Sequence, residues 1–431
     1  MIPHSLNLNL RGLPQSATLR INARSKAMMA EGRTIYRFGL GQSPFPVPEP
    51  VVEALRAHAA EKDYLPVEGL PALRVAVANF HRQRDLAAIS PDGVIIGPGS
   101  KELMFLLQLA FYGDLLVPTP CWVSYGPQAR ILGRHVKLLP TSFQERWRLS
   151  AERLARLCEA DRHRPRLLIL NTPGNPDGDS YTDRELRAIA EVAREHGVIV
   201  LSDEIYGMLH HTGAHRSIAR YYPEGTIISG GLSKWCGAGG WRLGTMAFPA
   251  ELHWLKDAMA AAASETYTSV TAPVQYAAVT AFELGPQIED YLAHARRILA
   301  ALGTEITARL RSSGLSVHPP TGAFYLWLDL SMLSEQLAAH DILDSPTLCE
   351  RLLTETGVAL LPGASFERPV EELTARMAYV DFDGAAALAI SRQHPLDEPL
   401  PLDALSEACG PVLEGVDCMC RWLTDSMRLD E

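Results

Sequence analysis

Several features that would assign a protein to a specialised class are absent from this sequence of 431 residues. No apolar run reaches the roughly 20 residues that a membrane-spanning helix requires, and Met1–Leu10 lacks the basic region of a signal peptide. An excess of positive charge is also lacking, because the net charge is −10, which argues against a surface for nucleic acids or anionic membranes. We therefore expect a cytoplasmic globular enzyme that binds neither nucleic acid nor membrane.

Cysteine is scarce, and its seven residues are scattered and odd in number, as in proteins of a reducing compartment. Cys409, Cys418 and Cys420 form the one close group, but a Cys-x-Cys pair without a second pair is weak evidence for a metal. Elsewhere in the sequence, the adjacent residues His210 and His211 lack the helical i, i+4 spacing with carboxylates that a metal site uses. The sequence therefore predicts no metal site.

Lysine is also rare, since six of the 40 basic residues are lysines, and this narrows the search for a chemically special amine. Lys234 ends the segment Ile227–Lys234, which begins like a buried strand, and a glycine-rich turn and Arg242 follow it. A bare ammonium ion at the end of a core strand is unfavourable, whereas an amine held as a Schiff base with pyridoxal phosphate (PLP) is not. The alternative is a lysine that extends from a strand end to water, and this segment alone does not separate the two.

Three further segments have the same form, an apolar run followed by polar residues where a strand would end. They are Gly93–Ile96 before Gly97–Glu102, Arg166–Leu170 before Asn171–Gly178, and Val198–Leu201 before Ser202–Tyr206. Strand–helix–strand repetition from about 93 to 245 predicts a largely parallel sheet. Ligands of open α/β sheets collect at the carboxyl ends of the strands, so these polar residues can converge on one pocket.

The residue types at these strand ends are those that PLP chemistry requires. Asp203 can keep the pyridine nitrogen protonated, and Asn175 and Tyr206 can donate hydrogen bonds to the ring oxygen. Trp122 offers a flat face on which the ring could stack. Taken singly, each residue has an ordinary explanation as a turn, a helix cap or a core aromatic, and the case depends on their joint occurrence in this order.

A phosphate group also has candidate partners. Gly99, Ser100 and Lys101 open a helical segment whose free N–H groups suit a phosphate dianion. Arg242 can add a bidentate contact, and Ser233 supplies a hydroxyl.

At these residues the sequence resembles the class I/II aminotransferases of PLP-dependent fold type I, over about residues 13 to 385. Four blocks carry the resemblance: Tyr64–Arg74 (YLPVEGLPALR) to a "Y…G…LR" segment, Asn171–Gly178 to "NPxNPxG", Ser202–Tyr206 to "DEIY", and Ser233–Gly244 (SKWCGAGGWRLG) to "SK…GxRxG". The resemblance implies an α/β fold, with a three-layer large domain whose mostly parallel sheet binds PLP and a smaller discontinuous α/β domain.

The same resemblance implies a division of the chain. Residues 1–50 would form an N-terminal arm and part of the small domain, residues 51–290 the large PLP-binding domain, and residues 291–431 the small C-terminal domain with an extra tail. The sequence assigns no function to the tail after about residue 395. A homodimer is also implied, in which Tyr64 reaches the neighbouring active site.

Residue roles follow from the resemblance as expectations. Lys234 would hold PLP as a Schiff base and move a proton at the substrate Cα, with Asp203 at the pyridinium and Tyr206 at the ring oxygen. The expected cofactor-binding set is Tyr64, Gly99, Ser100, Lys101, Trp122, Asn175, Asp203, Tyr206, Ser233, Lys234 and Arg242. The expected substrate-binding set, with Arg376 as the clamp for the α-carboxylate, is Gly41, Trp122, Asn175 and Arg376.

Three positions depart from the family pattern. Gly231 stands three residues before Lys234, where a serine is usual, so one phosphate donor is missing or supplied elsewhere. The Gly41 stretch reads GQSPF where "GEPDF" is common, and Cys121 precedes Trp122 where an aromatic residue is common.

The sequence thus predicts ping-pong transfer of an amino group from an L-amino acid to a 2-oxo acid. One alternative is a different PLP reaction on the same scaffold, such as elimination, replacement, cyclisation or decarboxylation, because the same residues would serve it. The other is a PLP-binding regulatory protein, but no basic helix-turn-helix segment precedes residue 13. Trp235, Tyr125 and Phe45 could line an apolar pocket, which predicts a neutral or aromatic donor in preference to aspartate.

Overall fold

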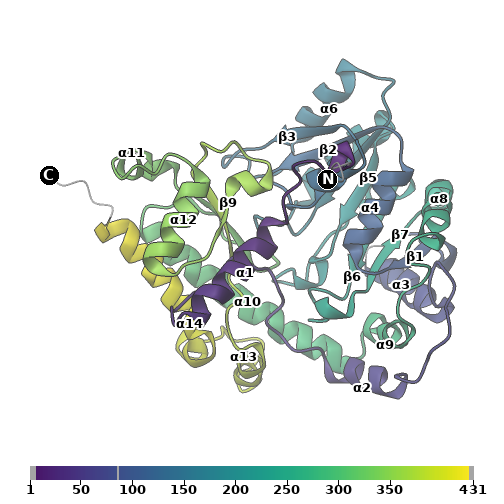
Figure 1. Ribbon diagram of the computed structural model, residues 1–431. Helices are drawn as coiled ribbons and strands as arrows, with labels where there is room; N and C mark the ends of the chain where they lie inside the picture. The colour runs from purple at the N-terminus through teal and green to yellow at the C-terminus, as the bar shows by residue number, and fades with distance from the viewer. Residues whose placement is uncertain (1–5, 85–86, 427–431) are drawn as a thin grey trace, which may run out of the picture.

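The computed structural model describes residues 6–84 and 87–426, and a seven-stranded sheet is its central feature (Figure 1). The strands in spatial order are β1 (Val94–Gly97), β7 (Gly244–Ala247), β6 (Thr226–Gly231), β5 (Ile199–Asp203), β4 (Arg166–Asn171), β2 (Asp114–Thr119) and β3 (Val136–Pro140). Strand β7 is antiparallel to both of its neighbours, and the other adjacent pairs are parallel. The mostly parallel sheet predicted from the strand–helix–strand pattern is confirmed.

Both faces of this sheet are buried because apolar residues follow one another along the strands and point alternately to the two sides. Leu115 and Leu167 pack on one side, whereas Leu116 and Leu168 pack on the other. Helices α4 (Ser100–Ala110), α5 (Tyr125–Ile131) and α8 (His253–Ser264) cover the first face. The second face is covered by α3 (Pro71–Arg84), α6 (Ala151–Ala160), α7 (Asp183–Glu195) and α9 (Ala272–Glu283). The sheet and its two helical layers form the predicted three-layer arrangement.

Helix α7 shows how the sequence sets an element that positions the site. Thr182 caps it through a capping box, because the Thr182 side chain accepts from the Glu185 N–H and the Glu185 side chain accepts from the Thr182 N–H. The buried residues of α7 lie on one stripe that packs under β4 and β5. The helix therefore holds the carboxyl ends of these two strands side by side.

A second, three-stranded sheet lies apart from the first in Figure 1. Its antiparallel strands are β8 (Tyr325–Asp329), β10 (Thr374–Ala378) and β9 (Leu361–Pro362), in that order. The helices around it are α10 (Pro286–Ser312), α11 (Ser334–Ala338), α12 (Ser345–Thr356), α13 (Gly384–Ser391) and α14 (Leu402–Arg421). Helix α10 is long and amphipathic, with buried residues such as Ile288, Leu292 and Leu299 on one face.

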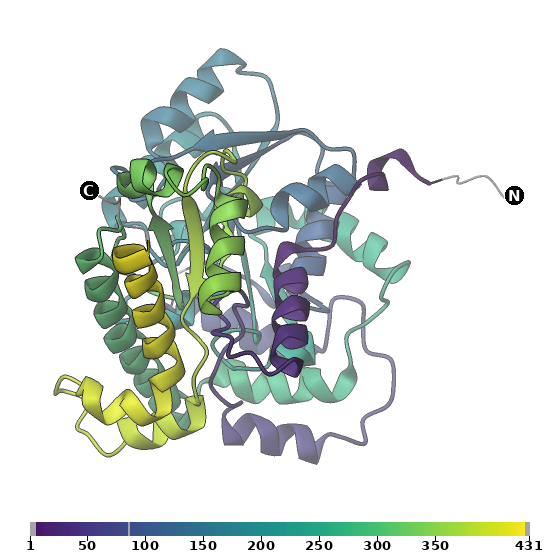
Figure 2. The same ribbon diagram turned by 60° about the vertical axis from the view of Figure 1, so that its left-hand side comes forward.

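The N-terminal segment packs against this C-terminal region. Met28 of α1 (Ala17–Ala30) contacts the cluster that holds Leu353 of α12, and Figure 2 shows the two helices side by side. The Tyr36 N–H donates to the Gly357 oxygen at 2.9 Å, and α2 (Glu49–Ala57) then leads to the large sheet. The domain boundaries at residues 50 and 290 stay a prediction, and residues 1–5 and 427–431, at the two ends of the predicted small domain, lie outside the described residues.

The tail after residue 395 is part of the core. Helix α14 buries Leu405, Val412, Val416 and Met419 against α10 and α13, and a π-helical turn extends to Ser426. Within residues 6–84 and 87–426, no helix combines the length and the apolar character needed to cross a membrane. The packing of α14 therefore makes the tail a structural part of the C-terminal region.

Candidate active site

The carboxyl ends of three neighbouring strands bring the predicted residues together. Asn171 of β4 lies beside Asp203 of β5, and Asp203 lies beside Ser229 of β6. Asn175 and Lys234 follow the ends of β4 and β6 within a few residues. This edge of the sheet faces β8 and β10 of the second sheet, because Arg376 of β10 donates to the Asn175 side chain.

Lys234 is the amine of this cluster. Its Nζ donates to the Gly41 carbonyl oxygen at 2.7 Å and lies 5.6 Å from the centre of the Tyr206 ring. Burial, followed by the positive charges of Arg376 and Arg242, lowers the pKa of Lys234 to about 8. About a tenth of the amine is therefore unprotonated at pH 7, far more than for an ordinary lysine, which suits a nucleophile or a proton carrier.

Asp203 is a buried carboxylate with a hydroxyl partner. The Tyr125 hydroxyl donates to its Oδ2 at 2.5 Å, and the Ile205 N–H donates to its Oδ1 at 3.4 Å. Burial raises the pKa of Asp203 to about 6, while the hydrogen bond from Tyr125 opposes that rise. The site thus holds a negative charge that lacks a full cationic partner. The protonated pyridine nitrogen of a bound pyridoxal phosphate would supply one.

The raised pKa of Asp203 predicts a pH-dependent stability of the cofactor-free protein. The folded state keeps the proton up to about pH 6, whereas the unfolded chain loses it near pH 4, so the contribution of Asp203 to stability falls as the pH rises through this window. Asp203→Asn removes the buried charge and is expected to raise the free energy of unfolding at pH 8 by up to about 2 kcal/mol. Urea unfolding at pH 8 and pH 5 tests this, because the gain should shrink at pH 5; a destabilised variant at pH 8 would contradict it.

Arg376 is the buried cation on the other side of the cluster. Its Nη1 donates to Asn175 Oδ1 at 3.0 Å and its Nη2 donates to the Gly39 oxygen at 2.6 Å. The guanidinium lies 4.7 Å from the centre of the Tyr325 ring and 5.1 Å from that of Phe366. Its Nε has no hydrogen-bond partner among the described residues, although the side chain is only 2% exposed. A buried guanidinium with an unused donor fits a carboxylate ligand.

Arg242 and the first turn of α4 form a cationic recess. Arg242 donates to the oxygens of Gly239 at 2.9 Å and Pro98 at 3.3 Å. Gly99 precedes the helix at φ +92°, and a side chain on it would collide with the Arg242 guanidinium. No side chain of the described residues caps the N-terminus of α4, so the first N–H groups of this helix, together with Arg242, are available to an anion. Ser233 lies in the turn between β6 and Lys234.

The departure at Gly231 has a steric reason. Its φ is +149°, and a Cβ there would lie 2.7 Å from the Leu243 oxygen and 2.9 Å from the Gly244 Cα. A serine would therefore strain the pairing of β6 with β7, so the backbone at this position favours glycine over the usual serine.

An open cavity of about 710 Å³ is lined by Val123, the residue after Trp122, and not by Lys234 or Arg376. Its wall is apolar at Leu13, Phe105 and Val123. Lys101 also lines the cavity, and its Nζ lies 5.1 Å from the centre of the Trp122 ring. From the sequence, only the backbone N–H of Lys101 was expected to take part, so its ammonium group at this wall was not predicted.

The three residues predicted to line an apolar pocket are mostly buried, and the expected apolar pocket stays a prediction. Trp235, Tyr125 and Phe45 are 3%, 1% and 3% exposed and are packed in the core. Trp235 packs on Phe282, Phe45 packs on core aromatics, and Tyr125 is the hydroxyl partner of Asp203. None of the three lines the open cavity beside Trp122.

Tyr64 is the predicted residue that the single chain does not bring to the cluster. It is 90% exposed in the loop between α2 and α3. An aromatic side chain that extends this far from its own chain is available to a neighbouring molecule.

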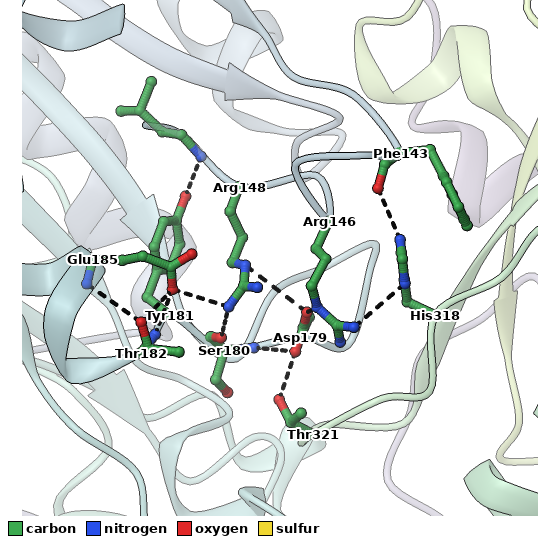
Figure 3. Close-up of polar contacts among 11 residues, drawn as sticks. Phe143, Arg146, Arg148, Asp179, Ser180, Tyr181, Thr182, Glu185, His318 and Thr321 are labelled. Carbon is green, nitrogen blue, oxygen red and sulfur yellow. Dashed lines mark hydrogen bonds and ion pairs between the residues drawn. The ribbon is translucent and has the colours of Figure 1, made fainter. Parts of the chain in front are cut away.

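An ionic network fixes the loop that carries Asn175 (Figure 3). Arg146 Nε donates to Asp179 Oδ2 at 2.8 Å, and Thr321 donates to Asp179 Oδ1 at 3.0 Å. Arg148 joins Asp179 to Glu185 of α7. The network connects the loop after β4 with the segment before β8, two parts of the chain that both contribute to the site. Because the partners are far apart in sequence, no local motif indicates it.

Comparisons with known proteins agree with this geometry. The family model described as aminotransferase class I and II matches residues 33–379. An aspartate aminotransferase of Bacillus sp. (strain YM-2) is 31% identical over 380 residues, which cover 86% of this chain and 93% of that protein. An aspartate/prephenate aminotransferase of Thermus thermophilus is 32% identical over 366 residues, with 84% and 91% covered.

Solved structures give the same result. The aspartate aminotransferase of Thermus thermophilus with maleate superposes with a TM-score of 0.83 at 27% identity, over 97% of this chain and all of that one. An aromatic aminotransferase of Pyrococcus horikoshii superposes with a TM-score of 0.76 at 26% identity, over 90% and 95%.

Proposed function

Because the chain belongs to the class I and II aminotransferases, we propose that it transfers the amino group of an L-amino acid to a 2-oxo acid with pyridoxal phosphate held at Lys234. Family membership makes the protein an aminotransferase; the cofactor, its lysine and the residue roles are the proposal. The observation that carries it is the position of the Lys234 amine, which has a lowered pKa and lies in one cluster with Arg376, Tyr206 and Asp203. No other reaction type is favoured by a contact in this cluster.

The residues of the site fit the proposed cofactor. Asp203 offers a buried negative charge for a ring nitrogen, and Tyr206 and Asn175 offer donors for a ring oxygen. The first turn of α4 and Arg242 suit a phosphate group. When bound, pyridoxal phosphate supplies a carbonyl carbon that accepts the amino group and a ring that withdraws electrons from the substrate Cα.

The remaining steps are performed by side chains of this chain. The Arg376 guanidinium, which donates to the Gly39 oxygen, orients the substrate carboxylate, and the backbone of Gly41 two residues further on would contact the same carboxylate. The Lys234 amine then carries a proton to and from the substrate Cα. Because amino acid and oxo acid share the carboxylate that Arg376 recognises, one site serves both in turn, which supports a ping-pong order.

The cavity beside Trp122 supports a dicarboxylic donor, contrary to the preference expected from the sequence. Lys101 places an ammonium group at its wall, and Arg20 adds a second positive charge. Glu102 and Glu367 also line the cavity, but Glu367 is paired with Arg130 at 3.2 Å. Several relatives are named aspartate aminotransferases, which agrees with a site for a second carboxylate.

A panel of donors tests this preference. We expect aspartate to be turned over with a kcat/KM at least about tenfold above that of phenylalanine or alanine, since a charge-assisted hydrogen bond contributes about 1.5–3 kcal/mol. Lys101→Gln keeps the backbone and is expected to lower kcat/KM for aspartate by about 10- to 100-fold while alanine changes little. Lys101→Arg is the matched control that keeps the charge. Equal or better use of phenylalanine by the unmodified protein would contradict the proposal.

The assembly and the location are also proposals. We propose a homodimer in which Tyr64 contacts the phosphate in the neighbouring site, supported by its 90% exposure. A monomer mass in light scattering would contradict the dimer. We further propose a cytoplasmic location, which the seven free cysteines support; recovery in a membrane or extracellular fraction would contradict it.

A further inference from the structure

Tyr325 is a buried tyrosine at the start of β8, and it belongs to none of the predicted cofactor-binding or substrate-binding sets. It is 1% exposed and is paired in register with Ala378 of β10, two residues from Arg376. Three kinds of contact meet on this one side chain: a hydroxyl–hydroxyl bond, a ring–cation contact and a steric contact with a glycine. All three partners belong to the candidate active site.

The hydroxyl contact is made with Tyr206. The two hydroxyl oxygens are 2.7 Å apart, and the rings meet edge to face at 5.4 Å. If the Tyr206 hydroxyl donates to the ring oxygen of the cofactor, its own oxygen is left as an acceptor. The Tyr325 hydroxyl is then the donor, and a hydroxyl that accepts a hydrogen bond is a stronger donor itself.

The ring contact is made with Arg376. The centre of the Tyr325 ring lies 4.7 Å from the guanidinium carbon, within the range of a cation–π contact. The same hydroxyl occupies the space where a side chain on Gly41 would project, so only glycine fits there. Gly41 in turn accepts the hydrogen bond from Lys234. The Tyr325 side chain therefore contacts two functional side chains, those of Tyr206 and Arg376. It also lies against the backbone of Gly41, which accepts the hydrogen bond from the Lys234 amine.

The network in Figure 3 fixes the segment that leads to this tyrosine. Thr321 donates through its hydroxyl to Asp179, and the N–H groups of Thr321 and Gly322 donate to the Gly178 oxygen. On the other side, the Ala323 N–H donates to the Leu209 oxygen at 3.1 Å. The segment before Tyr325 is thus bonded both to the loop of Asn175 and to the loop of Tyr206.

We infer that Tyr325 is a positioning residue that acts at two points: its hydroxyl strengthens Tyr206 as a donor to the cofactor ring oxygen, and its ring orients Arg376. This inference rests on the proposed function. The charged groups that face the two hydroxyls are Arg376 on β10, Lys234 after β6 and Asp203 at the end of β5. They stay in place when only the Tyr325 hydroxyl is removed.

The hydroxyl is tested by the pH midpoint of the visible absorption band of the purified holoenzyme, measured without substrate. A donor to the ring oxygen stabilises its negative charge and lowers the proton affinity of the adjacent nitrogen. Tyr325→Phe is expected to raise the midpoint by about half a pH unit, and Tyr206→Phe by more. On the Tyr206→Phe background, Tyr325→Phe should add no shift, because Tyr325 acts through Tyr206.

The ring is tested by steady-state kinetics on two variants. Tyr325→Phe keeps the ring and should leave KM for both substrates within about twofold, whereas Tyr325→Leu should raise both by about tenfold. Tyr379→Phe is the matched control, because Tyr379 is equally buried and its hydroxyl has no hydrogen-bond partner in the described parts of the chain. It should change neither the midpoint nor KM.

Two results would overturn the inference. One is an unchanged midpoint in Tyr325→Phe, and the other is an equal shift on both backgrounds, which would mean that Tyr325 does not act through Tyr206. An unchanged KM in Tyr325→Leu would remove the second half of the inference. Failure of the proposed function is distinguishable from these, because the unmodified protein would then show no visible band with added cofactor.

Discussion

Replacing Lys234 by alanine is expected to abolish the visible absorption band of the bound cofactor and to lower kcat at least about 1000-fold. The reason is that one amine has two tasks in the proposed site, to hold the cofactor and to move the proton at the substrate Cα. The lowered pKa of about 8 and the burial of this amine support the proposal of both tasks. Spectra with added pyridoxal phosphate and single-turnover kinetics measure the two effects separately.

Lys26→Ala is the control for this prediction, because Lys26 is an exposed lysine of α1. It should keep both the band and the turnover of the unmodified protein. If Lys234→Ala retained a visible band in the absence of substrate, another lysine would hold the cofactor and the assignment of the site would fail.

Replacing Arg376 by alanine is expected to raise KM for the amino acid and for the oxo acid alike, by about 100- to 1000-fold, because a buried charged hydrogen bond to each carboxylate is lost. The cofactor should stay bound, since Arg376 contacts Asn175 and Gly39 rather than the cationic recess at Arg242. Steady-state kinetics with both substrates and the visible band measure the two outcomes. A large loss confined to one substrate would contradict a shared carboxylate clamp.

Two further variants separate recognition from stability. Arg376→Lys keeps a positive charge but not the planar fork, so it should recover a small part of the lost affinity. Arg166→Ala removes an equally buried arginine at the opposite end of β4, which is bonded to the backbone oxygens of Asp161 and Arg164. It should lower the unfolding midpoint and leave KM unchanged. A comparable rise of KM in Arg166→Ala would show that the Arg376 effect is structural.

Local patterns in the sequence were sufficient for the mostly parallel sheet and for residues at strand ends, whereas the three-layer domain was predicted from the family resemblance. Asp203 and Lys234 are near the ends of strands whose apolar runs are visible in the sequence, and parallel strands necessarily align their carboxyl ends. The helix after the Asn175 loop was also readable, because its capping box is a local signal. Features of this kind depend on neighbours within one turn or one strand.

Contacts between distant segments could not be predicted in the same way. Tyr125 and Asp203 are 78 residues apart, Tyr206 and Tyr325 are 119 apart, and Arg376 and Gly39 are 337 apart. No periodicity links such pairs, and Tyr125 was accordingly placed in a substrate pocket instead of beside the acid. Lys101 was misjudged for a related reason, because the path of its side chain over Trp122 depends on how α4 packs.

The most direct test of the account is the visible absorption spectrum of the purified holoenzyme during a half-reaction. Aspartate alone should convert the band near neutral pH to that of the aminated cofactor, and a 2-oxo acid should then restore it. Because the two substrates are added one after the other, this result would establish that one site transfers the amino group in two separate half-reactions. A band that persists while ammonia or another breakdown product accumulates would contradict the proposed reaction, and the absence of any band with added cofactor would contradict the role of Lys234.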